Sequence, residues 1–106
     1  MKEIIIDEIS YKIGTNTNEN QQLVQSSDPE FYWFHLEKFP SAHVVVSVNE
    51  LTNEIIFNAS SLVKEFSKYK FKHIGISFCK INNLIHDKEP GLVFFKSNRQ
   101  VKRFNL

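Results

Sequence analysis

Residues 31–36 read FYWFHL and residues 41–48 read SAHVVVSV, and these two stretches decide the fold. Both are rich in aromatic and β-branched side chains, which favour strands. Pro40 stands between them, where it cannot donate a hydrogen bond to a sheet. We therefore predict two antiparallel strands joined by a short loop, at the centre of a small, mostly antiparallel sheet.

Side chains alternate between the two faces of a strand, which assigns each hairpin residue to a face. One face is apolar throughout and is predicted to be core: Tyr32, Phe34, Leu36, Ala42, Val44, Val46 and Val48. If the loop sets His35 opposite His43, Trp33 lies opposite Val45 on the second face. That face then carries an indole, two imidazoles and two hydroxyl groups, so it is too polar to be expected to form only core.

The segment before the hairpin is predicted to hold one or two strands that end at Gly14, followed by a short helix. Residues 15–20 read TNTNEN. Asparagine side chains compete with the backbone for hydrogen bonds, so the helix is not expected to begin before about Asn18 or Asn20.

The clearest helical pattern follows the hairpin. Apolar side chains in residues 55–66 recur with a period of 3.6 residues, and Thr52 or Asn53 is the expected N-cap. Lys64 and Lys68 are four residues apart, so they are expected to project together from the outer side of this main helix.

The last third of the chain is predicted to add strands. Residues 71–80 alternate loosely and favour a strand, whereas residues 82–90 are polar and favour a loop. Residues 91–96 and 99–104 flank a turn around Ser97 and are predicted to form a closing hairpin with basic residues on both limbs. The expected fold class is α+β, with one main helix packed on the sheet and one short helix.

Length and composition favour one domain. The chain has 106 residues, of which 42% are hydrophobic, so residues 1–106 are expected to form a single domain with its own core. No apolar run approaches the ~18 residues of a membrane span, and the first residues lack the apolar core of a signal peptide. Cys79 is the only cysteine, which excludes an intramolecular disulfide. A cytoplasmic protein is expected.

The small net charge hides an asymmetry between the two halves of the chain. Residues 1–58 hold 3 Lys and Arg against 9 Asp and Glu, a net charge of −6, whereas residues 59–106 hold 10 against 3, a net charge of +7. A basic half is a recognised feature of proteins that contact nucleic acid, because phosphate seeks positive potential. The alternative is an ordinary solvated surface rich in lysine.

Catalytic and metal-binding interpretations are less favoured. The four histidines, His35, His43, His73 and His86, could supply a metal site, but no short-spaced pair of ligands accompanies them. The sequence has no Gly-x-Ser-x-Gly motif and no glycine-rich phosphate loop. Neither an enzyme nor a cofactor is therefore expected, although a small hydrolase using His35 and His43 stays open as a weaker alternative.

The sequence resembles a known family, the NFACT RNA-binding domain (NFACT-R), once catalogued as a domain of unknown function. Trp-Phe-His at 33–35 followed by Ser-Ala-His-Val at 41–44 is similar to that family's Trp-Phe-His and Pro-Gly-Ser-His-Val signature. The resemblance extends from Gly14 to Val101, with Thr15 and Phe31 where the family has lysine and aspartate. The matching motif residues are Gly14, Asn16, Asn20, Trp33, Phe34, His35, Ser41, His43, Pro90 and Gly91.

The resemblance implies an α+β module that binds RNA. Its larger relatives carry the module beside a DNA-glycosylase-like domain, a helix-hairpin-helix domain and a coiled coil, and they act in ribosome quality control on stalled large subunits that carry peptidyl-tRNA. The present chain is similar to the small stand-alone form, and translation is the implied context.

The residues and the resemblance together predict a nucleic-acid-binding module, with structured RNA, tRNA or rRNA, as the ligand. Trp33, His35 and His43 are expected to stack on bases or bond to them. The phosphate contacts are expected from Lys64, Lys68, Lys80, Lys96, Arg99, Lys102 and Arg103. The alternative is an adaptor that docks on a ribosomal or quality-control protein through the aromatic and histidine face, without touching RNA.

Overall fold

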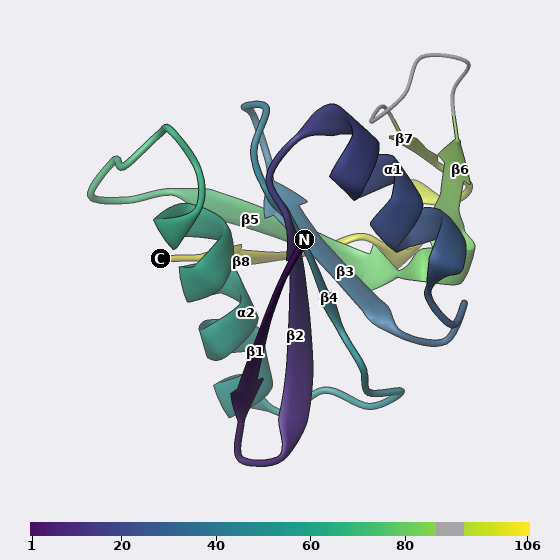
Figure 1. The fold of residues 1–106 in the computed structure, drawn as a ribbon. Coiled ribbons are helices and arrows are strands. Elements are labelled where there is room, and N and C mark those ends of the chain that lie inside the picture. Colours follow the sequence, from purple (N-terminus) through teal and green to yellow (C-terminus); the bar gives the residue numbers. More distant parts are fainter. Residues whose placement is uncertain (87–92) are drawn as a thin grey trace.

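The central hairpin forms as predicted. In the computed structural model, which describes residues 1–86 and 93–106, β3 (Tyr32–Leu36) and β4 (His43–Val46) pair antiparallel with Trp33 opposite Val45. The register continues to place His35 next to His43, whose ring centroids are 4.9 Å apart. The hairpin lies in the middle of the main sheet (Figure 1).

The main sheet is antiparallel throughout and, within the described residues, has six strands in the order β1-β2-β4-β3-β5-β8. The four strands outside the hairpin are β1 (Lys2–Ile6), β2 (Ile9–Gly14), β5 (Gly75–Lys80) and β8 (Lys102–Asn105). A smaller two-stranded sheet pairs β6 (Leu84–His86) with β7 (Val93–Phe95). The α+β class and the two strands ending at Gly14 are therefore confirmed.

The two helices begin at side-chain caps. Thr52 accepts a hydrogen bond from the backbone of Ile55 and caps α2 (Asn53–Glu65), as predicted. The short helix α1 (Thr17–Ser26) begins earlier than predicted, because Asn16 caps it by accepting from the backbone N–H of Glu19. An asparagine-rich segment that was expected to delay the helix instead starts it.

The two helices cover opposite faces of the sheet, and each encloses a core. The apolar face of the hairpin packs against α2 through residues that include Phe34, Val44 and Val63. The other face packs against α1 and the small sheet through Trp33, Val45, Leu23, Val24 and Leu84 among others. Figure 1 shows α1 next to β6 and β7, on the side of the sheet away from α2. The sheet is therefore buried on both sides near its centre.

Predictions in the last third of the chain are only partly confirmed. The strand predicted at 71–80 forms and ends at Lys80 but begins only at Gly75, whereas the loop predicted at 82–90 is wrong in its first part, which contains a 3-10 turn (Ile81–Asn83) and β6. The closing hairpin does not form, because β7 pairs with β6 whereas β8 pairs with β5. Val93 and Phe95 are drawn to the second core, and β8 covers the open edge of β5. Pro90 and Gly91 lie outside the described residues.

Gly14 gives a first stability prediction. A Cβ added at Gly14 would lie 2.3 Å from the side-chain oxygen of Asn20 and 3.0 Å from its backbone nitrogen. Gly14→Ala must therefore move α1, and we expect a loss of about 1–3 kcal/mol in the free energy of unfolding measured with urea. Gly75→Ala is the matched control, since its Cβ would meet nothing closer than 3.5 Å. Equal stability of the two variants would contradict this account.

Candidate nucleic-acid interface

The signature aromatic and histidine side chains form a buried cluster. Trp33 is 1% exposed and His43 is 3% exposed. The indole Nε1–H of Trp33 donates a hydrogen bond of 3.0 Å to Nδ1 of His43. The ring of His35 stacks on the indole with centroids 5.5 Å apart and meets the ring of His43 edge-on. The three side chains share one face, as predicted, but Trp33 and His43 are buried in the core and His35 is half-buried.

The hydrogen bonds fix the protonation of both imidazoles. Nδ1 of His43 accepts from Trp33, so His43 is neutral with its proton on Nε2. Nδ1 of His35 lies 2.5 Å from the carbonyl oxygen of Leu36, so this nitrogen carries the proton and donates. Burial lowers the pKa of His43 to about 3, with a further contribution from His35, and burial likewise lowers the pKa of His35.

The buried cluster changes the interpretation of Trp33. An indole with 1% exposure has no face open to a base, so the expected stacking platform does not exist here. Trp33 and His43 are likewise closed to the partner of an adaptor, and His35 is the one of the three side chains that is partly exposed. Cys79, the single cysteine of the chain, lies opposite Trp33 in the pairing of β3 with β5, and burial raises the pKa of its thiol to about 11. A neutral, buried thiol is not an activated nucleophile.

The other signature residues that the structure describes have structural roles. Asn16 caps α1, Asn20 packs against the bare backbone of Gly14, and Phe34 stacks on Phe78 in the first core. The Ser41 hydroxyl accepts from the backbone N–H of Leu36 and donates to the carbonyl of Ala42, which closes the hairpin loop. The signature therefore specifies this fold more directly than it specifies a ligand.

Four of the seven predicted phosphate-binding residues meet in one groove. Lys80, Arg99, Lys102 and Arg103 line a groove of about 660 Å³ beside the β5–β8 edge of the sheet. Tyr32, Leu51, Ile56, Phe78, Cys79 and Gln100 complete its lining. The groove has an apolar floor from β3, β5 and the start of α2, with a cationic rim from β8 and the segment before it. We call it the basic groove.

Two of these four cations already have carboxylate partners. Nζ of Lys80 lies 2.7 Å from Glu30, and that hydrogen bond raises the pKa of Lys80. Nε of Arg103 lies 2.6 Å from Glu37. Within residues 1–86 and 93–106, Arg99 and Lys102 form no ion pair. The uncompensated positive charge of the groove therefore comes from Arg99 and Lys102.

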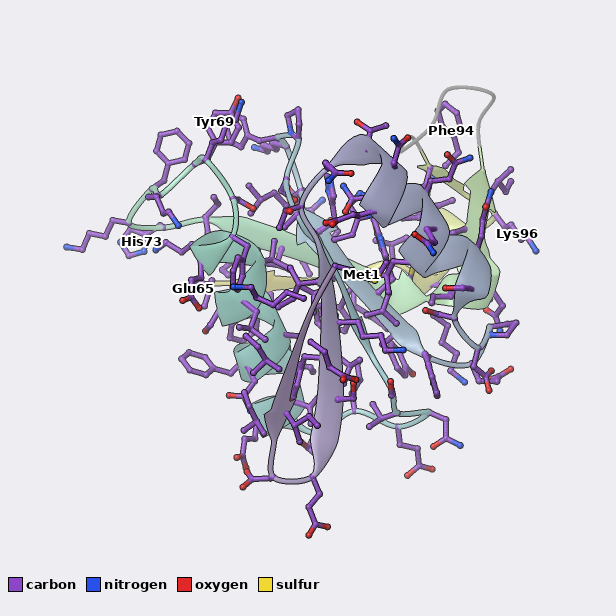
Figure 2. All side chains as sticks on the ribbon, in the orientation of Figure 1. Met1, Glu65, Tyr69, His73, Phe94 and Lys96 are labelled. Carbon is purple, nitrogen blue, oxygen red and sulfur yellow. The ribbon has the colours of Figure 1, made fainter. Side chains whose placement is uncertain are left out.

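The other three predicted phosphate contacts lie elsewhere. Lys64 lines a separate pocket with Lys70 and Leu106. Lys68 does not share a helical face with Lys64, because α2 ends at Glu65. Lys96 follows β7 on the side of the molecule that carries the small sheet (Figure 2).

The floor of the groove was not predicted from the sequence. Tyr32 was assigned to the core, yet its ring lines the groove with Nζ of Lys80 5.8 Å from its centroid. The register that pairs Tyr32 with Lys80, and Phe78 with Lys102, creates this arrangement. This arrangement can be found only when the order of the strands in the sheet is known, because β3, β5 and β8 are far apart in sequence.

The described part of the chain has neither a cluster of metal-binding side chains nor a helix able to span a membrane. Residues 1–86 and 93–106 contain no cluster of three or more His, Cys, Asp or Glu side chains arranged to hold a metal ion. No helix among these residues has the length and apolarity needed to cross a bilayer.

Comparisons with known proteins give relatives but no family model that matches. The chain is 29% identical over 100 residues to Coiled-coil domain-containing protein 25 of Danio rerio, and 31% identical over 100 residues to that of Mus musculus. These matches cover 85% of this chain and 48% of each relative, so the chain spans about half the length of these curated proteins.

Two further proteins are similar over most of this chain. Rqc2 homolog RqcH of Bacillus subtilis (strain 168) is 26% identical over 93 residues, which is 84% of this chain and 16% of RqcH. The solved structure of the C-terminal part of the fibronectin/fibrinogen-binding protein from Streptococcus suis superposes with a TM-score of 0.87 and 21% identity, covering 98% of this chain and 43% of the other. The structural match shows that the two share a fold.

Proposed function

We propose that this chain is an RNA-binding module of the NFACT-R family that binds structured RNA, either tRNA or rRNA, through the basic groove. The observation that carries the proposal is the meeting of Lys80, Arg99, Lys102 and Arg103 along one groove, although Lys80 ends β5 and the other three lie in residues 99–103. Cations along an edge, above an apolar and aromatic floor, suit a ligand with a phosphate backbone and bases.

Family and context rest on sequence similarity. The Trp-Phe-His and Ser-Ala-His-Val signature resembles NFACT-R, and the similarity to RqcH covers most of this chain. We infer a cytoplasmic role in translation or ribosome quality control, with a ribosomal or quality-control protein as a possible second partner. In this proposal the chain binds its ligand and catalyses no reaction. Of the two histidines of the hydrolase alternative, His43 is buried and accepts a hydrogen bond from Trp33.

The test is the salt dependence of RNA binding. We expect Arg99→Ala/Lys102→Ala to weaken binding of fluorescein-labelled tRNA and to reduce the slope of log Kd against log salt by about 1.4–1.8, because each lost phosphate contact contributes about 0.7–0.9. Fluorescence anisotropy at several salt concentrations measures both quantities. The two substituted side chains are exposed and pair with no carboxylate of the described residues, so the fold should survive.

Lys2→Ala/Lys12→Ala is the matched control. It removes the same charge from exposed side chains on β1 and β2, at the opposite edge of the sheet. We expect it to leave the slope unchanged. If the groove variant bound tRNA as tightly as the parent chain at low salt, the nucleic-acid proposal would be abandoned in favour of a protein-binding adaptor.

A further inference from the structure

The loop between α2 and β5 alternates lysine with aromatic residues. Residues 68–73 read KYKFKH, and we call residues 67–74 the aromatic loop. Figure 2 shows Tyr69 and His73 on this loop, beyond the end of α2 that Glu65 marks. The function proposed above makes no use of these side chains.

Three aromatic rings from two loops gather there. The ring of Tyr69 stacks on that of Phe39, with centroids 4.6 Å apart and planes 27° apart. The ring of Phe71 lies 6.1 Å from Tyr69 with planes 19° apart, and 5.4 Å from Phe39. Phe39 and Tyr69 also pack against the first core, whereas Phe71 is 50% exposed. The cluster is therefore anchored at one end and open at the other.

Hydrogen bonds hold the aromatic loop in place. The Ser67 hydroxyl accepts from the backbone N–H of Ala42, 3.2 Å away, and donates to the carbonyl of Val63. This ties the loop to the hairpin connection that carries Phe39. The ammonium group of Lys70 turns back to the carbonyls of Lys64 and Glu65 and satisfies the end of α2. An open aromatic ring on a restrained loop loses little conformational entropy on binding.

The surroundings of the rings are cationic. Lys38, Lys68 and Lys72 are exposed, and none forms an ion pair within residues 1–86 and 93–106. Arg103 lines the basic groove and also the pocket that contains Phe39 and Phe71. Arg103, which pairs with Glu37 of the same pocket, therefore borders both sites. A polyanion that spans them can contact the lysines of the loop and Arg99 and Lys102 of the groove together.

We propose that the aromatic loop binds unpaired bases of an RNA, with Phe71 as the stacking surface and the flanking lysines on the phosphates. The inference rests on the proposed function and deepens it, because it selects RNA with single-stranded or looped segments. Near-parallel rings favour a base, which continues the stack. A membrane surface is less suited, since the only aliphatic side chain of the aromatic loop, Ile74, is buried.

The experiment compares Phe71→Ala with Phe57→Ala, which removes an equally exposed phenylalanine (53%) from α2. The probes are a labelled single-stranded oligoadenylate of about 12 nucleotides and a blunt RNA duplex of the same length. We expect Phe71→Ala to weaken oligoadenylate binding about 5- to 150-fold with an unchanged salt slope. Duplex binding should stay unchanged, and Phe57→Ala should alter neither affinity.

Several outcomes would overturn the inference. One is equal oligoadenylate affinity of the two variants, and another is an equal loss on the duplex. A third is a loss confined to phosphatidylserine-containing vesicles, which would assign the loop to a membrane surface. If the parent chain bound both RNAs and only Arg99→Ala/Lys102→Ala weakened them, this inference would fail and the proposed function would stand. If the parent chain bound neither RNA, both would fail.

Discussion

Trp33→Ala is expected to lower the free energy of unfolding by about 3–5 kcal/mol, because it opens a large cavity in the second core. Trp33 is 1% exposed and packs among Leu23, Val24 and Val45, which are themselves buried. A domain of this size is stable by only about 5–15 kcal/mol, so Tm should fall by about 15 °C or more, or the fold should be lost. Calorimetry or circular dichroism measures the change.

Two further variants separate size from hydrogen bonding. Trp33→Phe keeps much of the volume but removes the donor to His43, so we expect an intermediate loss of about 1–3 kcal/mol. Phe94→Ala removes a 56% exposed ring from β7 and should change stability by less than about 0.5 kcal/mol. A Trp33→Ala chain as stable as the parent would show that the indole is outside the core.

Acid is expected to destabilise the protein well above the pH at which carboxylates titrate. The pKa of His43 is about 3 in the folded state, against 6.5 for an ordinary histidine. Between pH 3 and pH 6.5, His43 therefore binds a proton in the unfolded chain but not in the folded chain. Its contribution to the free energy of unfolding is fully present above pH 6.5 and is lost as the pH falls. The loss from His43 is about 1.4 kcal/mol per pH unit, or about 2 kcal/mol between pH 7 and pH 5.

Burial is the main physical origin of the lowered pKa of His43, and the hydrogen bond from Trp33 also opposes a second proton. A second proton on His43 would have to go to Nδ1, where the indole N–H already donates, so two donors would face each other. His35 adds to the loss, since burial lowers its pKa as well. Urea unfolding at a series of pH values gives the number of protons taken up.

Two histidine variants test the assignment. His43→Gln keeps an acceptor for the indole but cannot titrate, so the pH dependence between pH 5 and 7 should weaken by about one proton. His73→Gln, at an exposed position on the aromatic loop, should retain the dependence of the parent chain. A titration of His43 near pH 6.5 in the folded state, followed by NMR, would refute the prediction.

Local patterns were sufficient for much of the fold. The alternation on both sides of Pro40 predicted the hairpin and its register, because a shift by one residue would have exposed Phe34 and Val44. The 3.6-residue period predicted α2 and its Thr52 cap, because helix patterns and caps are determined by near neighbours in sequence. These elements depend on contacts between residues that are close to one another in the sequence.

The errors arose where distant segments decide the structure. The polarity of the Trp33 face suggested an open surface, but α1 and the small sheet cover it and the imidazoles find partners inside. Residues 91–96 and 99–104 were predicted to form a hairpin with each other, yet β7 pairs with β6 and β8 pairs with β5. Local strand propensity says little about which distant strand will be the partner. The hydrophobic periodicity of these segments therefore could not predict how they pair.

The candidate site was predictable in composition but not in arrangement. Arg99 and Lys102 were among the expected phosphate contacts, and the structure brings them to one groove with an apolar floor. The same reasoning placed Lys64, Lys68 and Lys96 in the set, although they lie elsewhere. The lysine and aromatic alternation at 68–73 was visible in the sequence, but only the fold shows that Phe39 joins it.

The position of β8 at one edge of the sheet links ligand binding to solubility. An edge strand exposes unpaired backbone groups that can pair with a strand of another molecule, and charged side chains on the edge oppose such pairing. Lys102 and Arg103 begin β8 and are exposed, so their charges oppose pairing of this edge with the same edge of a second copy. If these two charges are neutralised, by substitution or by a bound polyanion, the chain also loses part of its protection against edge-to-edge aggregation.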